Sequence, residues 1–221
     1  MNGRVAVVGE LVNLSIDKVE IDGNPVQASN AETTILLNKP AGYLVSRRDP
    51  YHSRTVYDLL PETHAHLFPV GRLDLNTEGM LLLTNDGQLT ERITHPRYGV
   101  DKTYRALVRG TPDTEVLHKL ETGVPVEGKP TAPARARIVT ENRDRAWPPM
   151  DGESEIEIII HEGRKREVRL MLEGVGYHVR RLRRVRLGGL DLGSLKQGQW
   201  RVLTQREIDR LRSAANMKKS R

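Results

Sequence analysis

The side chains best suited to chemistry lie between residues 71 and 84. This stretch reads Gly-Arg-Leu-Asp, then Leu-Asn-Thr-Glu-Gly, then an apolar run. Asp74 therefore lies just before a predicted buried strand, and Arg72 lies two residues before it. A carboxylate beside a fixed positive charge stays ionised, as a nucleophile or a base must. An Arg–Asp pair taken alone is more often a structural contact that closes a turn.

A second cluster of candidate residues is basic. From Arg164 to Arg186 the chain has nine Lys or Arg residues and two acids, Glu167 and Glu173. The whole chain of 221 residues has a formal net charge of +6. Clustered positive charge is typical of a phosphate-binding surface, so we expect a polyanionic partner. Aromatic residues make up only 4% of the chain, so binding cannot depend on rows of stacked rings.

The sequence also excludes several classes of function. It has no cysteine, which excludes disulfides, thiolate metal sites and cysteine nucleophiles. It contains no HExxH, GxSxG or phosphate-binding glycine loop, and its seven histidines are scattered. No apolar run approaches the roughly 20 residues of a membrane span. We expect a soluble, cytoplasmic, monomeric protein that has no signal peptide and does not associate with membranes.

Hydrophobic periodicity predicts a mixture of strands and helices. It lacks the regular alternation of a parallel α/β protein, so we predict an α+β fold with a mixed, mainly antiparallel sheet and flanking helices. Strands are predicted at 34–39, 102–108 and 155–160, and helices at 88–94, 111–121 and 164–172. A short helical turn is predicted at 55–60 and an exposed loop at 140–154. The segment 179–187 fits neither the helical nor the strand period.

Four separated motifs carry a resemblance to a known family. The string GRLDxxTxG, with the apolar run and Thr-Asn-Asp-Gly after it, resembles the catalytic motif of pseudouridine synthases. It is most similar to the branch that modifies single uridines in ribosomal RNA. The segments KPAG at 39–42, KTY at 102–104 and EGRKREVR at 162–169 agree in order and spacing. The resemblance covers about residues 32 to 207, and DPxxxxTVYDLLP at 49–61 points to ribosomal RNA, with the large subunit favoured.

The resemblance implies a role for each matching residue. Asp74 would be the nucleophile or base, Tyr104 would pack on the extruded base and assist its proton chemistry, and Arg169 would pair with Asp74. An arginine suits that partnership because it stays charged at any working pH. Family members carry a second arginine where this chain has Leu170, so one RNA contact is missing from the pattern. Leu182 would line the uracil pocket, and the other predicted RNA or substrate contacts are Arg72, Asn76, Thr77, Lys102, Arg164, Lys165, Arg166 and Arg183.

The implied reaction has simple chemical requirements. It breaks the bond from ribose to the base nitrogen and rejoins the base through carbon 5, on a base that has left its helix. One carboxylate is enough, so we expect no metal and no cofactor. A non-catalytic RNA-binding assembly factor is the alternative, but retention of Asp74, Tyr104 and Arg169 together argues against it. A glycosidase would need two acids, and only Glu78 lies near Asp74.

The predicted domain organisation has three parts. Residues 1–31 resemble the C-terminal half of an S4 RNA-binding module, with short strands over 4–26 and without the two helices that normally precede them. A plain β-hairpin packed on the main domain is the alternative reading of this segment. Residues 32–208 would form the catalytic domain and 209–221 a basic tail, for which we expect disorder from Ala214 to Arg221.

Overall fold

The computed structural model describes residues 1–13, 16–26, 32–140 and 147–217, and the chain forms two compact units, Met1–Glu32 and Thr33–Arg221. In the first unit, β1 (Glu20–Ile21) and β2 (Asn24–Pro25) pair as an antiparallel hairpin. The other strands predicted between residues 4 and 13 do not form. A strand needs a paired neighbour and a buried face, whereas Val8 and Leu11 are fully exposed here. The S4-like character of this unit stays a prediction.

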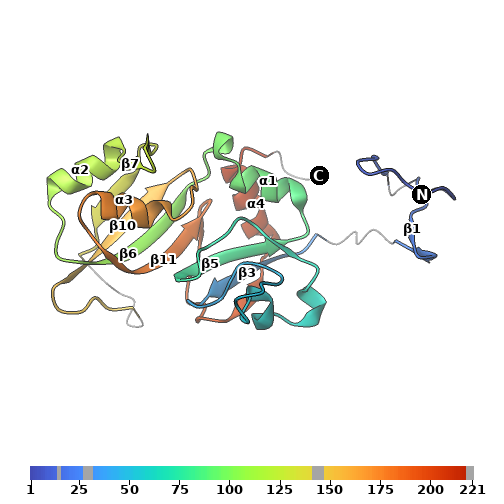
Figure 1. Cartoon of the computed structure of the whole chain (residues 1–221), viewed down its shortest axis with the longest axis horizontal. Coiled ribbons are helices and arrows are strands. Elements are labelled where there is room, and N and C mark those ends of the chain that lie inside the picture. The colour runs from blue at the N-terminus through green and yellow to red at the C-terminus, as the bar shows by residue number, and fades with distance from the viewer. Residues whose placement is uncertain (14–15, 27–31, 141–146, 218–221) are drawn as a thin grey trace. The chain divides into compact units, whose positions relative to one another are not determined.

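A nine-stranded sheet forms the centre of the second unit, as far as the structure describes it (Figure 1). Seven strands follow the order β13–β3–β5–β11–β6–β10–β9, while β4 pairs with β5 and β12 pairs with β11. All these pairs are antiparallel except β5–β11, so the predicted mixed, mainly antiparallel sheet is confirmed. The strands are β3 (Thr34–Lys39), β4 (Phe68–Pro69), β5 (Thr77–Thr84), β6 (Lys102–Arg109), β9 (Arg135–Ile138), β10 (Glu153–Ile160), β11 (Val179–Leu187), β12 (Leu190–Asp191) and β13 (Trp200–Val202), and a separate hairpin joins β7 (Pro125–Val126) to β8 (Lys129–Pro130).

In the part of the chain that the structure describes, four α-helices flank this sheet in two groups. The helices α2 (Thr114–Thr122) and α3 (Glu167–Gly174) lie over β6 and β10, and α1 (Gly87–Thr94) and α4 (Gln205–Ala214) lie beside β3 and β5 (Figure 1). The first pair contributes to one buried apolar cluster and the second pair to another. The central strands β3 and β5 supply both clusters with alternate residues, which explains their unbroken apolar runs. The described residues also form three short 3-10 helices: η1 (Val56–Leu59), η2 (Glu62–His64) and η3 (Pro96–Tyr98).

The parallel contact between β5 and β11 depends on Gly79. Its φ is +100°, and a Cβ atom there would overlap the carbonyl oxygen of Arg184. Only glycine allows two backbones to approach this closely in this conformation. The contact places Thr77 of β5 beside Leu182 of β11, so the loop that carries Asp74 ends next to β11.

The structure moves the start of some predicted elements and assigns one segment that fitted no period. The helix predicted at 111–121 is α2, Thr114–Thr122. Of the exposed loop predicted at 140–154, residues 141–146 lie outside the described residues, Trp147 is buried and Glu153 begins β10. The helix α3 begins at Glu167 and not at Arg164, because Arg166 has a left-handed backbone with φ of 54°. The segment 179–187, which fitted neither period, is strand β11. Its pairing with β6 contains two register shifts, and such bulges disturb the regular alternation of side chains between faces.

The C-terminal segment is a helix where a tail was predicted. The boundary expected after residue 208 falls inside α4, whose Thr204 and Glu207 form a capping box and whose Leu211 is fully buried. Residues 218–221 of the predicted tail lie outside the described residues. In the described ranges, every helix is too short or too polar to span a lipid bilayer.

Candidate active site

A cavity of about 300 Å³ brings most of the predicted site residues together. It is bounded by the loop before β5, by β6 and β11, and by the loop before α3. Nine of the twelve predicted residues line it: Arg72, Asp74, Thr77, Lys102, Tyr104, Arg164, Lys165, Arg166 and Leu182. The other three are Asn76, Arg169 and Arg183. Arg183 lines a second cavity together with Thr103 and Arg105.

The loop that carries Asp74 is held by a buried lysine. The Nζ atom of Lys39 donates to the carbonyl oxygens of Asp74 (3.2 Å), Leu75 (3.1 Å) and Thr77 (2.8 Å). Burial lowers the pKa of Lys39 to about 8, against the opposing negative charges of Glu78 and Asp74. Lys39 was not among the predicted site residues, although it opens the Lys-Pro-x-Gly motif. Its contacts fix the backbone from which the half-buried Asp74 side chain enters the cavity.

Arg169 lies next to the loop that carries Asp74. Both residues belong to the described part of the chain, and there Arg169 donates to the carbonyl oxygens of Asn76 (3.0 Å) and Val179 (3.0 Å). Burial lowers the pKa of Arg169, and the negative charge of Asp74 opposes that shift. The pairing of Arg169 with Asp74 stays a prediction: the two charges interact, and the hydrogen bonds of the guanidinium go to backbone carbonyls. Arg169 instead ties α3 to the Asp74 loop and to the start of β11.

Tyr104 enters the cavity from the middle of the sheet. It lies on β6, opposite Ile158 of β10 and Arg184 of β11. Its side chain is 7% exposed and lines the same cavity as Leu182. A tyrosine and a leucine from adjacent strands give this wall a flat, largely apolar surface suited to a planar base.

A pair of glutamates holds the arginine-rich loop. The Arg164 amide donates to Glu167 (2.9 Å), and the Ala132 amide donates to Glu162 (2.8 Å). Burial, and then the hydrogen bond to Glu162, raise the pKa of Glu167 to about 8. Burial opposes ionisation of Glu162 too, but hydrogen bonds from Glu167 and the Ala132 amide lower its pKa. The two carboxyl groups therefore titrate as a pair in which ionisation of Glu167 is disfavoured, an arrangement that the sequence did not predict.

Comparisons with known proteins agree with this geometry. Residues 33–174 match the model of the RNA pseudouridylate synthase family. A ribosomal large subunit pseudouridine synthase B from Bacillus subtilis (strain 168) is 37% identical over 97% of this chain and 87% of its own length. A ribosomal small subunit pseudouridine synthase A from Escherichia coli (strain K12) is 34% identical over 93% of this chain and 87% of its own length. A crystal structure of a pseudouridylate synthase superimposes with a TM-score of 0.74 at 28% identity, over 95% of this chain and 86% of that one.

The chain belongs to the RNA pseudouridylate synthase family. It is accordingly an isomerase that forms pseudouridine in RNA, and the predicted enzyme class is confirmed.

Proposed function

We propose that this enzyme converts a specific uridine of ribosomal RNA, in the large subunit, into pseudouridine at the cavity described above. The observation that carries the proposal is the arrangement of that cavity. Asp74, Tyr104 and Leu182 line it together, and four exposed cations, Arg72, Arg164, Lys165 and Arg166, line it as well. Such a site suits one flipped base inside and RNA phosphates outside.

Each residue has a proposed role in the reaction. Asp74 is the carboxylate that acts on the nucleoside, either at the ribose carbon or on a ribose proton. Tyr104 packs against the extruded uracil and assists its proton chemistry, and Leu182 forms the apolar wall of the pocket. Arg169 acts as a positioning residue, because its hydrogen bonds hold the Asn76 carbonyl and hence the loop that carries Asp74.

The proposed RNA contacts extend beyond the cavity. Lys165 and Arg166 are exposed at the rim of the cavity, which favours contact with phosphates over burial. The side chain of Arg164 is about one-third exposed and contacts Glu162 and the carbonyls of Lys129 and Pro130, so only its outer face is available to RNA. Asn76 and Arg183 stay predicted RNA contacts, and the S4-like segment at 1–31 would supply a second binding site. A monomeric state and a cytoplasmic location also stay predictions.

The test is direct modification of RNA. Purified large-subunit and small-subunit ribosomal RNAs are incubated with the protein and with Asp74→Asn, and new pseudouridines are mapped by primer extension after carbodiimide treatment. We expect one new stop in the large-subunit RNA with the parent protein and none with the variant. A stop only in small-subunit RNA, as the name of the Escherichia coli relative suggests, would correct the substrate. Binding without any new stop, in free RNA or in immature subunits, would favour the non-catalytic assembly factor.

A further inference from the structure

The basic side chains that line the cavity fall into two groups by burial. Arg72, Arg164, Lys165 and Arg166 are exposed. By contrast, Lys102 is 7% exposed and Arg184 is 3% exposed, although both line the same cavity. They come from adjacent strands, since Lys102 lies opposite Leu187 and Arg184 lies opposite Tyr104 in the β6–β11 pair. Two buried cations thus lie beside the proposed base-packing tyrosine.

Neither buried cation has an acidic partner among the residues that the structure describes. Arg184 donates through Nε to the Met80 carbonyl (2.8 Å), and its buried Nη2 atom has no hydrogen-bond partner there. Lys102 donates to the carbonyls of Val100 (3.2 Å) and His161 (3.4 Å). Carbonyl oxygens satisfy a donor but do not neutralise its charge. A buried polar group left without a partner is unusual enough in a folded protein to require an explanation.

The acids nearest to this pair give it little compensation. Glu167 and Asp101 both act on Lys102 electrostatically. Burial, and then the neighbouring Glu162, raise the pKa of Glu167 to about 8, which disfavours the negative charge that would compensate Lys102. Asp101 forms an ion pair with Arg135. The positive charge of Arg184 also reaches Lys102, and with burial it lowers the pKa of Lys102 to about 8. Two repelling cations in an apolar setting cost stability unless they serve another purpose.

We propose that Lys102 and Arg184 stabilise the negative charge that develops on the uracil ring when its bond to ribose breaks. This inference rests on the proposed function and adds two residues to the reaction. An electrostatic site of this kind acts mainly where charge appears, in the transition state and the anion, and less on the neutral base. Its effect is strong because the surroundings are buried, where fields are weakly screened.

The proposed step balances without any co-reactant. The bond from ribose C1′ to uracil N1 breaks, and its electron pair leaves with the ring, which is then a uracil anion. C1′ is left electron-deficient and is balanced by the Asp74 carboxylate. The anion turns so that C5 faces C1′, and an electron pair of the ring forms the C5–C1′ bond. The Asp74 carboxylate then takes the proton from C5, and water carries a proton back to N1, so the product has the same atoms and charge as the substrate. Lys102 and Arg184 stabilise the anion after the C1′–N1 bond has broken and before the C5–C1′ bond forms.

A phosphate group is a poorer occupant for this pair than the base. RNA phosphates lie on the outside of the chain and meet exposed cations such as Arg164 and Lys165. A flipped uracil, by contrast, enters the cavity itself, where Lys102 and Arg184 lie. Removing a buried cation should therefore affect turnover, and removing an exposed one should affect RNA affinity.

The first experiment compares single-turnover rates of Lys102→Met, Arg184→Met and the matched exposed variant Arg164→Met. Each buried variant should lower kcat by about 10²–10³-fold, the usual effect of removing one group that stabilises an anion. Its KM should change little, whereas Arg164→Met should mainly raise KM. Lys102→Arg and Arg184→Lys keep the charge and should restore most of the rate. Equal losses in the charge-keeping and the neutral variants, with melting temperatures unchanged, would overturn the proposal.

The second experiment does not depend on turnover. Calorimetry measures binding of barbiturate, a pyrimidine ring that is ionised at neutral pH, against neutral uracil. The parent protein should bind barbiturate at least about tenfold more tightly, or about 1.4 kcal/mol. Lys102→Met and Arg184→Met should abolish that preference and Arg164→Met should keep it. Equal affinity of the parent protein for both rings would refute the inference, even if pseudouridine forms. A clear preference without pseudouridine formation would instead refute the proposed function alone.

Discussion

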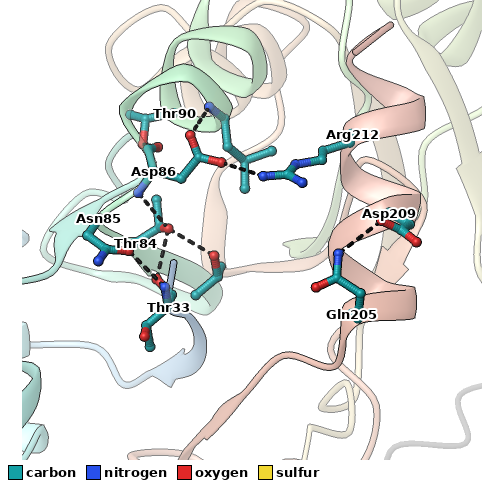
Figure 2. Close-up of polar contacts among 10 residues, drawn as sticks. Thr33, Thr84, Asn85, Asp86, Thr90, Gln205, Asp209 and Arg212 are labelled. Carbon is teal, nitrogen blue, oxygen red and sulfur yellow. Dashed lines mark hydrogen bonds and ion pairs between the residues drawn. The ribbon is translucent and has the colours of Figure 1, made fainter. Parts of the chain in front are cut away.

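Replacing Arg212 should reveal whether α4 is an integral part of the catalytic unit. Arg212 is 5% exposed, and its Nη2 atom donates to Asp86 Oδ2 at 3.0 Å (Figure 2). Asp86 also accepts the Leu89 amide through Oδ1 (2.9 Å), which caps the N-terminus of α1. Its own amide donates to the Thr84 hydroxyl (3.1 Å) at the end of β5. One buried carboxylate thus joins β5, α1 and α4.

The structure sets the size of the effect for Arg212→Met. Methionine fills a similar volume but leaves Asp86 buried without its cation, and breaking a buried pair from one side typically costs about 3–5 kcal/mol. A chain of this size loses roughly 2–4 °C of Tm per kcal/mol, so the melting temperature should fall by about 6–20 °C. Gln205→Ala is the matched control on the same helix. It removes only the exposed bond from Gln205 to Asp209 (3.1 Å; Figure 2) and should cost less than about 0.5 kcal/mol.

Urea unfolding followed by circular dichroism gives the free energies of unfolding, and a double-mutant cycle isolates the pair. Asp86→Asn keeps a good N-cap but removes the charge. If the ion pair dominates, Arg212→Met should cost much less in the Asp86→Asn background than in the parent chain. A loss below about 1 kcal/mol for Arg212→Met, or additive losses in the cycle, would show that the segment after residue 208 contributes little, as a tail would.

Five further substitutions test other parts of the structure and the site. Asp74→Asn should abolish isomerisation and leave RNA affinity within about twofold, measured by primer extension and filter binding, whereas turnover within tenfold of the parent would reject its role. Arg169→Ala should remove activity and lower the free energy of unfolding by about 1–3 kcal/mol, because charged hydrogen bonds to the Asp74 loop are lost. Arg164→Ala should instead reduce the slope of log binding constant against log salt concentration by about one unit. Glu167→Gln should remove a pH dependence: the folded-state pKa of Glu167 is raised from 4.5 to about 8, so the parent loses stability as pH rises through that window. Urea unfolding at pH 5 and pH 8.5 should show that the free energy of unfolding falls less in the variant than in the parent as the pH rises. Equal changes in the two proteins would contradict the proposed raised pKa of Glu167. Gly79→Ala should destabilise by roughly 1–3 kcal/mol or more through backbone strain alone, and an unchanged Tm would show that β5 and β11 can separate without cost.

The sequence by itself determined the family, the candidate catalytic carboxylate and the strands β3, β5, β6 and β10 of the sheet. Asp74 and Tyr104 lie in short motifs whose spacing is readable along the chain, and both line the cavity. Strands such as Thr34–Lys39 and Lys102–Arg109 follow from local apolar and β-branched patterns, which depend on near neighbours alone. These features needed no knowledge of distant contacts.

The tertiary structure alone decided which partners the charged groups find. Lys39 and the Asp74 loop lie 35 residues apart, and Asp86 and Arg212 lie 126 residues apart. Nothing in the local pattern around Arg184 separates a buried cation from the exposed arginines beside it. Burial and pairing of a charge depend on which strands and helices pack against it, and this packing is a property of the whole fold. For that reason the sequence placed Arg169 near Asp74, but only the fold showed that backbone carbonyls take its hydrogen bonds.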